Sequence, residues 1–65
     1  MEIKNNNIMR EEIYFIVQSM FQEKIKFYSE KEQKCRAKGA HSLANEYYDI
    51  VDELTQCAND IGVIV

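Results

Sequence analysis

Seven apolar residues in the C-terminal part of the chain follow the heptad spacing of a packed helix. Alternately four and three residues apart, they are Leu43, Tyr47, Ile50, Leu54, Cys57, Ile61 and Ile64. This a/d pattern is typical of a helix that buries one stripe against another helix. A second row repeats every seven residues beside the first and consists of Ala44, Val51, Ala58 and Val65. The doubled row predicts a helix with two helical neighbours rather than one.

The shortness of the chain limits the core that a single copy can bury. Its 65 residues allow one domain at most, and a chain of this size buries only about 60% of its unfolded surface. Small domains usually compensate with disulfides, a metal or oligomerisation. Two cysteines cannot form a disulfide framework, and the sequence has no cluster of metal ligands. Self-association is therefore the expected solution.

The periodicity predicts an all-α fold, an antiparallel helical hairpin. We expect a polar N-terminal tail over residues 1–7 and a single hairpin domain over 8–65, with a long helix over about 8–38 and a second helix over about 42–61. A short turn around residue 40 makes the two helices antiparallel neighbours. Pro is absent, and no Gly interrupts either helix.

The ends of the two helices have recognisable signals. Gly39 can end the first helix because glycine adopts positive φ without penalty. Ser42 is a favourable N-cap for the second helix, which Gly62 is expected to end. The apolar residues 63–65 then either fray or pack back onto the first helix.

The first helix is expected to carry a broad apolar face. At 100° per residue the face covers about half the circumference and comprises Met9, Ile13, Tyr14, Ile16, Val17, Met20, Phe21, Ile25, Phe27 and Tyr28. A hairpin closing near residue 40 pairs residues whose numbers sum to about 80, so Phe21 faces Ala58. The run from Ile13 to Val17 then extends beyond the second helix. Either residues 63–65 or another subunit must cover it.

We therefore expect the hairpin to dimerise into a four-helix bundle. The expected self-association core combines both helices: Ile13, Ile16, Val17, Met20, Phe21, Tyr47, Ile50, Leu54, Cys57 and Ile61. In the expected register Cys35 and Cys57 lie some 18 Å apart along the bundle, at 1.5 Å per residue. A disulfide needs Cα atoms within about 7 Å. Both cysteines are expected to be buried free thiols.

The residues that could perform chemistry are sparse, and we expect no enzyme and no cofactor. His41 is the single histidine and falls in the turn, where a solvated or helix-capping role is expected. A catalytic histidine needs an orienting carboxylate and a nearby nucleophile. Cys35 and His41 alone do not make a metal site. No signal peptide or membrane span is recognisable, so a cytoplasmic location is the expectation.

The charges of the two helices differ in sign. Six of the eight Lys and Arg residues fall between Lys24 and Lys38, whereas the segment from His41 onward contains five acids and no Lys or Arg. Cross-hairpin pairs of Lys31 and Lys34 with Glu46 and Asp49 would explain this asymmetry. Alternatively, the acids form a ridge that binds a basic protein. The candidate partner-binding residues are Ile8, Phe15, Glu46, Asp49, Asp52, Glu53 and Asp60.

Nucleic acid is a second possible partner, through Lys26, Lys34, Arg36 and Lys38. Glu23, Glu30 and Glu32 interrupt this basic region, and the sequence pI is about 5.0, whereas nucleic-acid-binding faces are usually continuous and strongly basic. A basic or DNA-binding protein is therefore the preferred partner, and nucleic acid is disfavoured.

The length, the central turn and the heptad stripe together resemble the Rop type of plasmid regulator. That resemblance implies a helical hairpin that dimerises into a four-helix bundle. The basic and aromatic face with which that family binds RNA has no clear counterpart here. The expected function is that of a small non-enzymatic intracellular regulator or inhibitor that self-associates and binds a protein partner. The alternatives are a nucleic-acid-binding hairpin dimer and a purely structural oligomerisation module.

Overall fold

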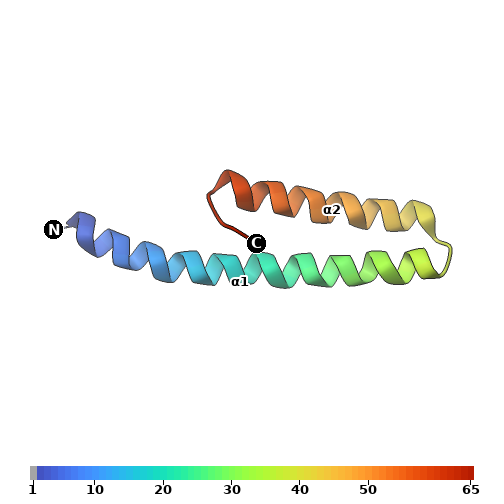
Figure 1. Ribbon diagram of the computed structural model, residues 1–65, viewed down its shortest axis with the longest axis horizontal. Coiled ribbons are helices and arrows are strands. Elements are labelled where there is room, and N and C mark those ends of the chain that lie inside the picture. Colours follow the sequence, from blue (N-terminus) through green and yellow to red (C-terminus); the bar gives the residue numbers. More distant parts are fainter. Residues whose placement is uncertain (1) are drawn as a thin grey trace.

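The chain forms an antiparallel hairpin of two α-helices (Figure 1). A computed structural model describes the backbone of residues 2–65 and the side chains of residues 11–65. Helix α1 spans Glu2–Ala37 and helix α2 spans His41–Asp60. The N-terminal part of α1 extends well beyond the end of α2, which gives an elongated molecule of 56 × 16 × 11 Å. The all-α hairpin expected from the heptad pattern is confirmed.

Helix α1 begins earlier than the sequence predicts. Its first residue is Glu2, so the expected start near residue 8 is wrong, and the backbone of residues 2–7 is helical rather than a tail. Asn is a weak helix former, but it costs at most about 0.7 kcal/mol per residue relative to Ala. Neither Pro nor Gly interrupts the segment. The side chain of Ile8, a candidate partner-binding residue, lies outside the described residues.

Gly39 ends α1 in a Schellman motif. Its φ of +82° lies in the left-handed region that only glycine adopts readily. The amide of Ala40 donates to the carbonyl of Cys35 at 2.8 Å, and the amide of Gly39 donates to that of Arg36 at 3.1 Å. This turn brings the chain directly into α2, whose N-cap is Ala40 without a side-chain cap. The expected capping role of Ser42 is therefore wrong, because α2 has already begun at His41.

Gly62 ends α2 in the same way. Its φ is +84°, and the amide of Val63 donates to the carbonyl of Ala58 at 2.8 Å. The motif commonly includes an apolar contact between these two positions, and here Val63 is only 4% exposed and Ala58 is fully buried. The chain then turns back toward α1 (Figure 1). Of the two expected fates of residues 63–65, the structure shows packing rather than fraying.

The two helices meet along rows of half-buried residues. On α1 this row repeats the four-three spacing and consists of Tyr14, Gln18, Phe21, Ile25, Tyr28, Glu32 and Cys35. On α2 the contact is centred on Ala44 and Ala58, both 0% exposed. Their small side chains let the helix backbones approach closely, and no large described side chain is fully buried. The core within one copy is therefore small.

The heptad stripe of α2 is rotated relative to the expectation. The flanking row of Ala44, Val51 and Ala58 faces α1, together with the half-buried Tyr47 and Leu54. The other members of the predicted stripe are exposed, namely Leu43, Ile50, Cys57, Ile61 and Ile64. The alanines occupy the buried position because the helices can pack more closely over a small side chain than over Leu or Ile.

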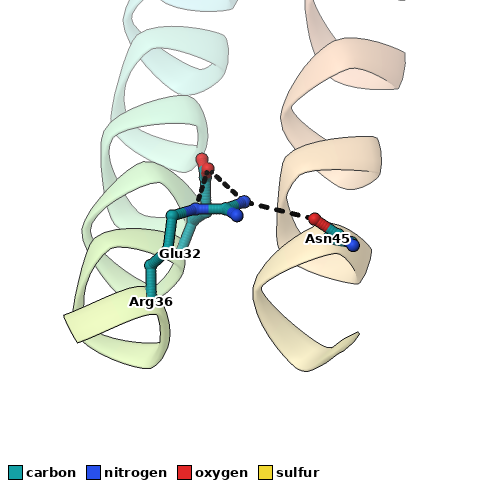
Figure 2. Close-up of polar contacts among 3 residues, drawn as sticks. All are labelled: Glu32, Arg36 and Asn45. Atoms are coloured by element: carbon teal, nitrogen blue, oxygen red, sulfur yellow. Dashed lines mark hydrogen bonds and ion pairs between the residues drawn. The ribbon is translucent and has the colours of Figure 1, made fainter. Parts of the chain in front are cut away.

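Polar contacts join the helices at both ends of the hairpin. Near the turn, the Arg36 guanidinium donates to the Glu32 carboxylate at 2.8 Å and to the Asn45 side-chain oxygen at 3.3 Å (Figure 2). At the far end, Gln18 Nε2 donates to the Ile64 carbonyl at 2.7 Å. The stacked rings of Tyr28 and Tyr47, 6.0 Å apart, lie between these contacts. The contacts of Arg36 and Gln18 fall close to the expected register, whereas Tyr28 stacks on a residue more than one turn away from the expected level.

The expected cross-hairpin ion pairs do not form among the described side chains. The one ion pair there joins Glu32 and Arg36 within α1. The Lys31 ammonium lies 5.1 Å from the centre of the Phe27 ring instead. A contact of this kind can be worth as much as a weak surface ion pair. Since neither Lys31 nor Lys34 pairs with an acid of α2 among the described side chains, the prediction is wrong.

Candidate interaction surface

One face of the hairpin exposes large apolar side chains from both helices. We call it the apolar face and define it by Ile13, Ile16, Met20 and Phe27 of α1 with Leu43, Ile50, Cys57 and Ile61 of α2, all exposed. Ile16 is 60% exposed and Ile61 is 62% exposed. Met20 and Phe27 follow Ile13 at intervals of seven residues, as Ile50 and Cys57 follow Leu43. Both rows therefore run straight along their helices.

Two open grooves show that the rows of α1 and α2 belong to the same face. A groove of about 280 Å³ is lined by Met20 and Lys24 of α1 and by Leu54 of α2. A second groove, of about 290 Å³, is lined by Ile13 of α1 and by Ile61 and Val63, which follow the end of α2. The exposed apolar residues on the two helices therefore form one surface that spans the hairpin, rather than two separate stripes.

The molecule has more surface than a compact monomer of its size. A folded monomeric protein of 7.7 kDa is expected to expose about 4300 Å². This chain exposes 5267 Å², roughly 900 Å² more. A standard protein–protein interface removes about 800 Å² from each partner. The N-terminal part of α1, which extends beyond α2, contributes to this excess, so the excess reflects the elongated shape and does not measure an interface.

The expected self-association core is divided by the structure. Four of its members already contact the other helix of the hairpin and are half-buried, namely Val17, Phe21, Tyr47 and Leu54. The other six are exposed and lie on the apolar face: Ile13, Ile16, Met20, Ile50, Cys57 and Ile61. Cys57 and Cys35 are free thiols, as expected, but Cys35 is half-buried rather than buried. Burial of Cys57 within one copy is wrong, because its row points away from α1.

The candidate partner-binding residues lie elsewhere. Phe15 is 62% exposed and lies about 140° around α1 from Met20. The five acids of α2 are all exposed, namely Glu46, Asp49, Asp52, Glu53 and Asp60. They point away from α1, and only Asp52 has a side-chain contact, accepting from Gln56 at 3.0 Å. Phe15 and the acids do not form a common patch.

A basic groove near the turn contains two of the four basic residues expected to contact nucleic acid, Lys34 and Lys38. Lys31, Lys34 and Lys38 of α1 line it together with Cys35 and Tyr47, and its volume is about 160 Å³. The three lysines share one side of α1 because they are spaced three and four residues apart. Arg36, expected in the same basic set, is held by Glu32 instead. The sequence did not predict that Tyr47 of α2 would line this groove, because the spacing of residues within α2 does not show which residues of α1 lie beside it.

Other kinds of site receive no support from the described residues. Within them, no three His, Cys, Asp or Glu side chains come together as metal ligands. In the described part of the chain, neither helix has the length and apolarity needed for a membrane span. His41 is exposed at the first position of α2. Comparisons with protein-family models, curated proteins and solved structures found no significant match.

Proposed function

We propose that this protein is a non-enzymatic regulator or inhibitor that self-associates and binds a protein partner. The observation that carries the proposal is the apolar face, because monomeric proteins rarely expose a large contiguous apolar surface. The small core supports the same conclusion, since Ala44, Ala58 and Val63 are the buried residues among the described side chains. A hairpin this small gains its missing burial most simply from another copy.

The proposed assembly is a dimer that forms a four-helix bundle. Two hairpins placed face to face would each cover the other's apolar face. The exposed rows repeat every seven residues, which suits the shallow crossing angle of such bundles. A stable interface of this kind typically buries about 800 Å² per copy.

The proposed partner surface is the acidic outer side of α2. Glu46, Asp49, Glu53 and Asp60 would stay exposed on the outside of a four-helix bundle or at its edge. Their uniform sign suits a basic protein surface, and complementary charge mainly accelerates and orients such an encounter. A regulator of this kind would act by occupying its partner's basic surface.

The solution mass tests the proposal. Sedimentation equilibrium from micromolar to millimolar concentration should give twice the chain mass of 7.7 kDa. A compact monomer throughout that range would contradict the proposal. A stable dimer that captures no basic protein would instead favour a purely structural oligomerisation module.

The basic groove favours nucleic acid as a second candidate partner. Lys31, Lys34 and Lys38 could contact phosphates, and Tyr47 could stack on an unpaired base. Binding of single-stranded RNA should then weaken steeply as salt rises, since each phosphate contact releases counterions. Lys34→Ala should weaken RNA binding and lower its salt dependence. Gln22→Ala, at an exposed position of α1, should change neither. Salt-insensitive or absent binding would remove this candidate.

A further inference from the structure

We infer that the second copy docks on the apolar face with its turn at the same end, so that α1 of each copy lies over α2 of the other. This inference rests on the proposed dimer and adds its arrangement. A two-fold axis parallel to the helices gives this arrangement. An axis perpendicular to them would place the turns at opposite ends, with α1 over α1 and α2 over α2. These are the two symmetric ways to stack a hairpin on its own face.

The first argument comes from the charges that border the apolar face. Lys24 lines the groove with Met20 and Leu54 through the apolar part of its side chain, so it lies in the middle of the face rather than at its border. Lys31 follows Lys24 by seven residues and lies beside Phe27. On α2, Glu46 and Glu53 lie one turn either side of Ile50 and border the face there. Near the turn the α1 side of the face is therefore basic, with Lys31 and Lys34, and the α2 border is acidic.

Only the arrangement with both turns at one end brings these borders together. In it, α1 lies over the level of α2 that it already faces in its own hairpin. Lys31 then lies near the level of Glu46 and Glu53 of the second copy. With the turns at opposite ends, α1 lies over α1, and Lys31 meets no acid of α2. The opposed charges therefore favour the arrangement with both turns at one end.

The second argument is the match of apolar side chains. In the favoured arrangement Phe27 lies over the level of Ile50 and Leu54, and Met20 over the level of Cys57 and Ile61. The two rows on each helix repeat every seven residues, so these contacts continue along the interface. The exposed row of α2, which no part of its own hairpin covers, is thereby buried.

The distance between the two turns distinguishes the arrangements. A spin label at His41→Cys, in a chain that also carries Cys35→Ser and the apolar replacement Cys57→Ala, reports this distance by pulsed dipolar spectroscopy. His41 is exposed and lies off the apolar face, and the mass of the labelled sample is measured in parallel. With both turns at one end the Cα atoms lie about 15 Å apart, across the diagonal of a four-helix bundle. With turns at opposite ends they lie at least about 30 Å apart, the length of α2.

Each outcome has one meaning. A dimeric mass with the short distance supports the inference. A dimeric mass with the long distance overturns the inference and leaves the dimer standing. A monomeric mass without dipolar coupling overturns both, provided that the unlabelled natural sequence is also monomeric.

The variant Lys31→Gln gives a second, independent readout. If Lys31 lies near Glu46 and Glu53 of the second copy, removing its charge weakens dimerisation by about three-fold at low salt. With the turns at opposite ends Lys31 meets no acid of α2, so the same change leaves dimerisation unchanged. Lys26→Gln, on the other side of α1, controls for the change in net charge. Unchanged or tighter association of Lys31→Gln would overturn the inference.

Discussion

The hydroxyl of Tyr14 accepts a hydrogen bond from the backbone amide of Ile64 at 3.2 Å, across fifty residues of sequence. Gln18, one turn further along α1, donates to the Ile64 carbonyl. Both backbone groups of Ile64 are therefore bound by side chains of the helix to which the chain returns. Val63 beside them is buried, so the C-terminal segment is part of the fold.

Removal of the Tyr14 hydroxyl should loosen this segment without unfolding the hairpin. The bond is exposed, and such hydrogen bonds contribute about 0.5–1.5 kcal/mol. We expect Tyr14→Phe to speed amide exchange at Ile64 several-fold and to lower the free energy of unfolding by less than about 1 kcal/mol. Tyr48→Phe removes a hydroxyl from an exposed tyrosine and should do neither. Unchanged exchange at Ile64 would show that the hydrogen bond does not hold the segment.

The two glycines should be sensitive to alanine for conformational reasons alone. Both have positive φ, and an added Cβ would meet nothing within 4 Å. Gly39→Ala and Gly62→Ala should each destabilise the fold by about 1 kcal/mol, because L-residues are disfavoured in this region. The expected fall in melting temperature is about 4–8 °C for a domain of this size. Asn tolerates the left-handed region better, so Gly39→Asn should lose less. Equal losses for Ala and Asn would contradict this explanation.

Enlarging a buried alanine should be costly. Ala58 is 0% exposed at the helix contact, so a leucine there must push the helices apart. Overpacking of this kind usually costs about 1–3 kcal/mol. Ala58→Leu should therefore lower the midpoint of denaturant unfolding, whereas Ala37→Leu, at an exposed helical position, should leave it nearly unchanged. Similar midpoints for the two variants would mean that α1 and α2 are not closely packed at Ala58.

Charges on the apolar face should block self-association while the hairpin persists. Met20 and Ile50 are exposed in one copy, so Met20→Glu or Ile50→Glu would bury a carboxylate only in the dimer. We expect either change to weaken dimerisation at least about a hundred-fold, because burying an unpaired charge costs several kcal/mol. Sedimentation velocity and far-UV circular dichroism measure mass and helicity together. Phe15→Glu, on another side of α1, is the matched control and should remain dimeric.

Reversal of the acids should abolish capture of a basic partner. In a pull-down with an immobilised basic protein domain, Asp49→Lys combined with Glu53→Lys should reduce the bound fraction at least about ten-fold, since attraction becomes repulsion. Thr55→Lys adds one positive charge to α2 at a half-buried position nearer α1 and should reduce binding less. If reversal leaves capture unchanged, the acids are merely a solvated face.

Most of the fold follows from the sequence because its signals are local. The heptad spacing in α2 and the two glycines fix the helices, the turn and the antiparallel register. The start of α1 is harder to predict from the sequence, because the Asn residues at positions 5–7 are tolerated in a helix but do not favour one. Ser42 was a reasonable cap by residue type. The Schellman motif at Gly39 leads so directly into the next helix that α2 begins at His41, one residue before Ser42.

The orientation of α2 is harder to derive. Its apolar residues occupy two neighbouring rows, and either could face α1 by periodicity alone. The choice depends on the volume available between the helices, which favours Ala44 and Ala58 over Leu43 and Cys57. Gln18 and Glu32 conceal the matching row on α1, because their polarity breaks an otherwise regular four-three pattern. Their hydrogen bonds to Ile64 and Arg36 explain how polar side chains are accommodated there.

The alanine-centred contact between α1 and α2 has a thermodynamic consequence. Since no large described side chain is fully buried in one copy, little heat should be absorbed when an isolated hairpin melts, and its transition should be broad. Dimerisation would sharpen that transition and raise its midpoint as the protein concentration increases. The thermal tolerance of this protein would then be a property of the solution in which it is held, because it depends on the amount of protein present.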